Sequence, residues 1–92
     1  MDKSKIIVTV SGDDKVGIVA AFTGILAEMS VNVDDIRQSV MQDTFVMFLM
    51  GNISKSKHSF MEIKQALLKK GEEMELEVWV QLKTIFDKMH TI

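Results

Sequence analysis

The residues of this chain that are best suited to contact a ligand lie in two short segments. The first, Gly12–Gly17 (GDDKVG), joins two glycines with three charged residues and directly precedes a helical pattern. The second begins at Asn32, whose amide can both donate and accept hydrogen bonds. Exposed N–H groups at the start of a helix suit a carboxylate. Together these groups favour the binding of a small polar molecule.

The groups that nucleophilic catalysis needs are missing. There is no cysteine, which excludes disulfides, thiolate nucleophiles and cysteine-bound metals. His58 and His90 stand in polar or terminal surroundings, so we interpret both as solvated surface residues, with a helix-capping role as the alternative for His58. We therefore predict no catalytic residue, no cofactor and no enzymatic activity.

Four aspartates raise the question of a divalent cation, since Asp13 and Asp14 form one pair and Asp34 and Asp35 another. The first pair follows the end of the first predicted strand, whereas the second lies near the start of a strand parallel to it. The two pairs are then roughly 20 Å apart in one chain, and we predict no metal site there. If two copies joined antiparallel along the second strand, the pairs would approach each other, so a metal site across a dimer stays open.

The charge and hydrophobic composition of the chain limit the kinds of partner that it can bind. With 13 acidic and 11 basic residues the net charge is -2, which favours neither nucleic acid nor an anionic membrane as a partner. The initial apolar run of about five residues is too short for a signal peptide, and no stretch approaches the roughly 18 apolar residues of a membrane span. We expect a single cytoplasmic domain over residues 1–92.

The hydrophobic pattern predicts four strands and two main helices. The strands are Lys5–Ser11, Asn32–Gln42 (an edge strand with a bulge near Asp34–Asp35), Phe45–Met50 (central, both faces covered) and Glu75–Lys83. Apolar spacings of three and four predict the helices, from Ile18 and from a capping box at Ser59 and Glu62. Gly12–Gly17 is predicted as a loop, and Gln42–Thr44 as a hairpin turn.

Smaller features complete this expectation. Ala20, Ala21 and Gly24 predict close packing of the first helix, and Gly71 predicts the end of the second. Residues 84–90 predict a short last helix with Ile85, Phe86 and Met89 packed inward.

The element order is βαββαβ. With right-handed crossovers it predicts an α+β, ferredoxin-like sandwich, in which both main helices cover one face of a four-stranded antiparallel sheet and a short helix follows. The other face should be uncovered near Met47 or Phe48, together with Trp79. A hydrophobic fraction of 47% and this open face lead us to expect a homodimer.

The strings DDKVGIVA, NVDDI and IFDKM are typical of stand-alone single-domain members of the ACT family, which the whole chain resembles. The resemblance implies a regulatory module that binds amino acids, in which the position of Asp14 and that of Asn32 touch the ligand from opposite subunits. The candidate ligand-binding residues are Gly12, Asp13, Asp14, Val16, Gly17, Ile18, Asn32 and Asp34.

Two hypotheses of different kinds follow. The leading one is a homodimeric regulatory domain that binds an amino acid between its subunits and changes how the dimer meets a partner protein. The alternative is a protein–protein interaction module without a small ligand, and the cross-dimer metal site is a third possibility.

Overall fold

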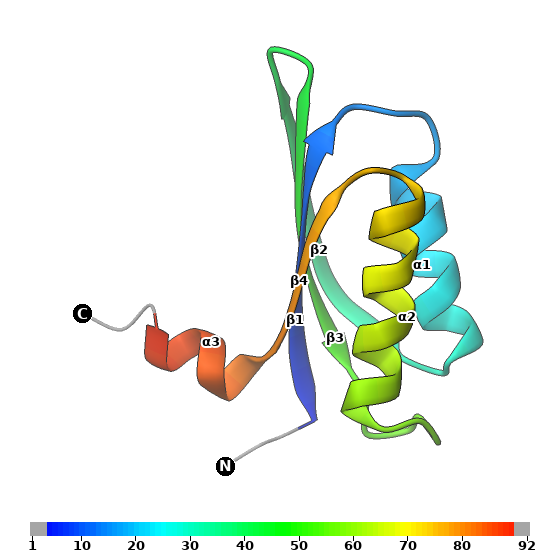
Figure 1. Ribbon diagram of the computed structural model, residues 1–92. Helices are drawn as coiled ribbons and strands as arrows, with labels where there is room; N and C mark the ends of the chain where they lie inside the picture. Colours follow the sequence, from blue (N-terminus) through cyan, green and yellow to red (C-terminus); the bar gives the residue numbers. More distant parts are fainter. Residues whose placement is uncertain (1–3, 90–92) are drawn as a thin grey trace.

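The computed structural model describes residues 4–89 and has the predicted ferredoxin-like layers. Its elements are β1 (Lys5–Asp13), α1 (Ile18–Glu28), β2 (Asn32–Met41), β3 (Thr44–Asn52), α2 (Phe60–Glu73), β4 (Glu77–Leu82) and α3 (Lys83–Met89). The antiparallel sheet has the order β2-β3-β1-β4, with α1 and α2 together on one face and α3 on the other (Figure 1).

The core lies between the sheet and the two main helices. Alternating residues of β1 and β3 point into it, as do the apolar stripes of α1 and α2, because a strand has a side-chain period of two and a helix one of 3.6. The fully buried side chains include Ile6, Val8, Val10, Phe22, Leu26, Met47, Ile63 and Leu67.

Strand β2 is the predicted edge strand. Its register against β3 shifts between Val33 and Asp35, which confirms the predicted bulge. The bulge changes which side chains face the helices, so that Ile36 and Val40 lie opposite the buried Leu49 and Phe45. Ile36 and Val40 nevertheless stay 37% and 53% exposed, because the helices do not extend over this edge.

Two predictions about the strands were wrong. Gly12 and Asp13 belong to β1 rather than to the loop, because their pairing with Phe45 and Thr44 continues the ladder. Strand β3 is central as predicted, but within the described chain the face away from α1 and α2 is covered only in part. Phe48 is 46% exposed, so it is Phe48 rather than the buried Met47 that lies with Trp79 on the open face.

The turn between β2 and β3 consists of Gln42 and Asp43, whose φ values are 50° and 69°. Two successive residues with positive φ are the pattern of a type I′ turn, whose twist matches that of the flanking strands. The predicted hairpin is therefore confirmed.

The three helices differ from expectation at particular residues. Helix α2 continues past Gly71 to Glu73, and Gly71 is buried where α2 meets β4. Gly24 in α1 faces open space instead of a close neighbour. In α3 Phe86 packs against the sheet as predicted, whereas Ile85 and Met89 are 49% and 66% exposed, and His90 lies outside the described residues.

The capping box of α2 supports a stability prediction. The Ser59 hydroxyl accepts a hydrogen bond from the Glu62 N–H at 3.1 Å, and the Glu62 carboxylate accepts one from the Ser59 N–H at 2.9 Å. We expect Ser59→Ala to lower the free energy of unfolding by about 1 kcal/mol. We expect Glu62→Gln, which retains an acceptor for the Ser59 N–H, to lower it less. Urea denaturation of the two variants tests this order, which the reverse ranking would contradict.

Candidate functional site

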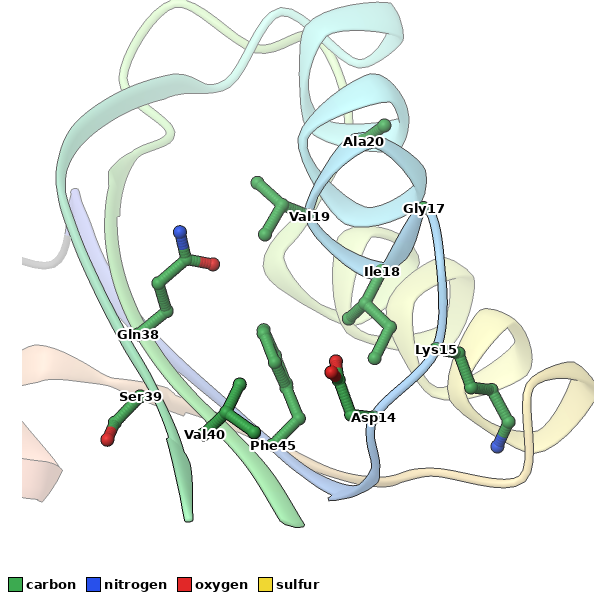
Figure 2. A pocket seen from close by; sticks show the side chains of 10 residues that line it. All are labelled: Asp14, Lys15, Gly17, Ile18, Val19, Ala20, Gln38, Ser39, Val40 and Phe45. Atoms are coloured by element: carbon green, nitrogen blue, oxygen red, sulfur yellow. The ribbon is translucent and has the colours of Figure 1, made fainter. Parts of the chain in front are cut away.

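A hollow of about 410 Å³ lies between the start of α1 and the second half of β2. Figure 2 shows the ten residues that line it, which come from the β1–α1 loop, from α1, from β2 and from the start of β3. Ile18 and Phe45 are almost completely buried and supply apolar surface, while Asp14, Gln38 and Ser39 supply polar groups. Its size falls in the range of small-molecule sites.

The loop that borders this hollow is held at two points. The Asp14 N–H donates to the carbonyl of Asp43 in the β2–β3 turn at 2.9 Å. The Lys15 ammonium donates to the carbonyl of Met74, which follows α2, at 2.6 Å. These bonds connect the loop to the β2–β3 turn and to the segment after α2, so the position of Asp14 beside α1 is defined by the fold.

Helix α1 begins at the hollow. Gly17 precedes it with φ 87°, a left-handed conformation in which glycine is favoured. Tight packing does not require this glycine, since a Cβ added there would meet nothing within 4 Å.

The first turn of α1 has no side-chain cap and no acidic residue. Its N–H groups therefore carry the positive end of the helix dipole without a charged side chain within that turn to offset it. Ile18, Val19 and Ala20, which make up this turn, all line the hollow. A carboxylate placed there would be stabilised by these N–H groups.

The opposite wall is formed by β2. Gln38 and Val40 lie on the helix-facing side of this strand, and Figure 2 shows the Gln38 amide directed into the space between β2 and α1. The wall therefore offers one group that can both donate and accept hydrogen bonds and one exposed apolar side chain.

The structure separates the predicted site residues into two groups. Asp14, Gly17 and Ile18 line the hollow. Gly12, Asp13 and Val16 lie nearby without lining it. Gly12 is paired within the sheet and Val16 is fully exposed to solvent.

Asn32 and Asp34 lie at the other end of the sheet. Asn32 pairs with Asn52, and Asn52 pairs in turn with Lys5 at the start of β1, whereas Asp13 lies at the end of β1. Asn32 borders a separate hollow of about 660 Å³ with Ser30 and Lys55 among its other residues. One chain therefore does not bring Asn32 to Asp14.

Sequence reasoning missed the wall opposite α1, which consists of Gln38, Ser39, Val40 and Phe45. It also missed Lys15, Val19 and Ala20 on the side of the loop and α1. A signal was present, because β1 and β2 are parallel and the end of β2 must then lie beside the loop that follows β1. The bulge at Val33–Asp35 was predicted and it decides which β2 side chains face α1, but a glutamine on an edge strand does not by itself indicate a ligand site.

Asp34 is the centre of a small polar network. Its carboxylate forms an ion pair with Lys5 and accepts a hydrogen bond from the Asn32 amide at 2.7 Å. The hydrogen bond from Lys5, followed by that from Asn32, lowers the pKa of Asp34 below its ordinary value of 3.8. In the single chain, Asn32 and Asp34 therefore bind each other.

This pKa shift predicts a dependence of stability on pH. A carboxylate whose pKa is lower in the folded state stabilises the protein above its unfolded-state pKa. That contribution is lost as the pH falls below 3.8 and through the folded-state pKa. We expect Asp34→Asn and Lys5→Met each to flatten the acid part of a plot of unfolding free energy against pH. Parallel acid profiles for both variants and the original chain would contradict this role of Asp34.

The four aspartates keep the predicted separation, with Asp13 and Asp14 at one end of the sheet and Asp34 and Asp35 at the other. Among residues 4–89, no three histidine, cysteine, aspartate or glutamate side chains gather closely enough to hold a metal ion. No helix in the described part of the chain is long and apolar enough to cross a membrane.

The layers of the fold, with a loop-to-helix hollow beside an edge strand, define a ferredoxin-like sandwich. Residues 4–81 match the ACT domain family. The chain belongs to this family, whose domains are typically regulatory and bind small molecules.

Relatives of the same length support this assignment. A UPF0237 protein of Methanococcus maripaludis is 45% identical over 95% of this chain and 97% of its own length, and one of Methanocaldococcus jannaschii is 42% identical over 97% and 99%. Among solved structures, an ACT domain protein from Streptococcus pneumoniae superposes with a TM-score of 0.79 at 34% identity, covering 94% of this chain and 97% of that one. The regulatory subunit of aspartate kinase from Thermus thermophilus, in a ligand-free form, shares the fold alone, with a TM-score of 0.66, 24% identity and coverage of 87% and 52%.

Proposed function

We propose that this chain is a regulatory domain that binds an amino acid in the hollow beside Gly17 and acts as a homodimer without catalysis of its own. The observation that carries the proposal is the juxtaposition of an uncapped helix start, an exposed carboxylate and apolar side chains around one hollow. The family supports the general role, since ACT domains are typically regulatory.

The chemistry of the hollow matches the three parts of an amino acid. The first-turn N–H groups of α1 suit the α-carboxylate, and the Asp14 carboxylate suits the ammonium group. Phe45, Val19 and Val40 offer apolar surface to an uncharged side chain. The ligand class that satisfies all of these groups at once is a free amino acid with an apolar side chain.

The homodimer would supply the group that one chain lacks. The outer edge of β2 has no strand beside it within the described chain, and Ile36 and Met41 on it are exposed. Antiparallel pairing of two β2 strands about the strand centre, between Ile36 and Arg37, places Asn32 of a second copy close to Met41. This position adjoins the hollow, so Asn32 would reach the ligand from the second copy.

Asp14 and Asp13 provide a matched test of ligand binding. In a thermal-shift screen of the free amino acids followed by calorimetry, we expect at least one apolar amino acid to stabilise the protein. Asp14→Asn should weaken that binding about tenfold, because it removes a charged hydrogen-bond acceptor. Asp13→Asn removes the same charge one residue away, outside the lining of the hollow, and should have little effect. Equal effects of the two substitutions would contradict the assignment of Asp14.

The dimer has its own test. A lysine on the helix-facing side of an edge strand opposes pairing with another strand. We therefore expect Ile36→Lys to abolish the β2 dimer in sedimentation velocity and, with it, tight ligand binding.

A second function is favoured by one observation. In the single chain Asn32 donates to Asp34, so it is already occupied by an internal partner. A protein-interaction module that uses the β2 edge without a small ligand agrees with this arrangement. If none of the amino acids shifts the unfolding temperature of a confirmed dimer, this second function replaces the first.

A further inference from the structure

Helix α3 presents apolar side chains on the side of the sheet that α1 and α2 leave open. The helix is held by Phe86, which lines a small hollow with Ile7 and Phe48, and by a hydrogen bond from the Gln81 amide to the sulfur of Met89 at 3.3 Å. Ile85 and Met89 are four residues apart and share one side of the helix. Both remain largely exposed in the described chain, and Figure 1 shows α3 projecting away from the sheet.

The sheet beside α3 carries a second apolar group. Trp79 of β4 and Phe48 of β3 are both register partners of Thr9 in β1, so the three residues form one row across the sheet. The two aromatic side chains are 52% and 46% exposed. Large half-exposed aromatic residues gathered on one face mark an interaction surface.

We propose that this open face binds a second copy of the chain, with a two-fold axis that places α3 of each copy over the Trp79–Phe48 row of the other. The contact is separate from the hollow and from the β2 edge, so it does not rest on the proposed ligand or on the proposed β2 dimer. With both contacts present, four chains would form one closed assembly where the two two-fold axes are perpendicular and intersect.

Area and symmetry favour a second copy as the occupant. Trp79, Phe48, Ile85 and Met89 together expose on the order of 400 Å² of mostly apolar surface per copy. A stable interface buries about 800 Å² per partner, of which slightly more than half is apolar. Because each copy carries both the projecting helix and the row that receives it, one two-fold contact covers both at once and closes.

The charges beside α3 and beside the Trp79–Phe48 row are also complementary. Lys88 near the end of α3 is exposed, and so is Glu77, which lies two residues before Trp79 on β4. When α3 of one copy lies over the row of the other, Lys88 can approach Glu77 of the second copy. Opposite charges at the rim of an interface set its register and its partner.

The experiment uses the full chain and its single tryptophan, Trp79. We expect its fluorescence maximum to move to longer wavelength on dilution, as sedimentation shows dissociation. Met89→Glu should weaken the association at least about tenfold and leave the emission red-shifted at all concentrations. Ile85→Glu should do the same without removing the Gln81 contact. Met61→Glu, an exposed methionine on α2, is the matched control and should change neither readout.

A charge exchange separates a contact between copies from a structural role. We expect Lys88→Glu to weaken the association and the double variant Lys88→Glu/Glu77→Lys to restore it, while the circular dichroism spectrum stays the same. Weakening without restoration would overturn the proposed register of the two copies.

The β2 variant Ile36→Lys separates this contact from the proposed β2 dimer. We expect it to retain the concentration dependence of the Trp79 emission, even if no β2 dimer exists. The proposal is overturned if wild-type emission is independent of concentration, if Ile36→Lys abolishes that dependence, or if Met61→Glu acts like Met89→Glu.

Discussion

Replacing Gly71 by alanine is expected to lower the free energy of unfolding by about 1–3 kcal/mol, although alanine is the better helix former. A Cβ at this position would lie 2.3 Å from Cγ2 of Val78 and 3.2 Å from the carbonyl oxygen of Leu76. The first contact is far inside van der Waals distance, and the second involves backbone that does not move easily. The clash therefore outweighs the gain in helix propensity, which is about 1 kcal/mol.

Gly24 provides the opposite case within the same protein. It also lies inside a helix, but a Cβ there would meet nothing within 4 Å. Gly24→Ala should raise the free energy of unfolding by up to about 1 kcal/mol. Urea denaturation at equilibrium measures both variants, and effects of the same sign would contradict this account of the two glycines.

A double-mutant cycle identifies the neighbour responsible for the cost at Gly71. Val78→Ala removes the Cγ2 atom that the new Cβ would meet. We expect Gly71→Ala to be much less destabilising in the Val78→Ala background than in the original chain, which gives a coupling energy. Additive effects would show that the cost arises from another contact, such as the Leu76 carbonyl.

The second large effect concerns two phenylalanines of β3. Phe45 is 4% exposed, belongs to the core and lines the hollow, whereas Phe48 points to the open face and is 46% exposed. Phe45→Ala should cost about 3–5 kcal/mol through lost burial and the cavity left behind. Phe48→Ala should cost about 1 kcal/mol or less when measured on the dissociated chain, because water already reaches this ring.

These two variants test which face of β3 is buried. Denaturation at low protein concentration, where copies are separated, gives both values. Since the run Phe45–Met50 of this strand is apolar throughout, its sequence does not distinguish the faces. Equal costs for Phe45→Ala and Phe48→Ala would indicate that both faces are covered, as the sequence alone suggested.

The arrangement of elements could be predicted from local patterns. The capping box at Ser59, the alternation of β4 and the short turn at Gln42–Asp43 each specify an element from a few neighbouring residues. The element order then leaves few topologies, because crossovers are right-handed.

The misplaced features depend on distant residues. Gly71 is a residue type that is typical of helix ends. Its role is instead to allow the close approach of β4, which only the packed structure reveals. Gly12 is a residue type that is typical of loops, yet its pairing with Phe45 keeps it in the sheet. Asp14 was identified from its loop, whereas Gln38 was not, because only the packed structure places this edge-strand residue opposite the start of α1.

The two edges of the sheet are unequal, and this inequality affects how copies can assemble. Strand β2 has ten residues, whereas β4 has six and leads directly into α3. Pairing of β2 with β4 of the next chain would repeat head to tail and produce a filament unless the rotation closed a ring. The short β4 and the helix at its end limit that head-to-tail ladder. Pairing of β2 with itself joins ten-residue edges and stops at two chains, so the shape of this sheet favours finite assemblies over fibres.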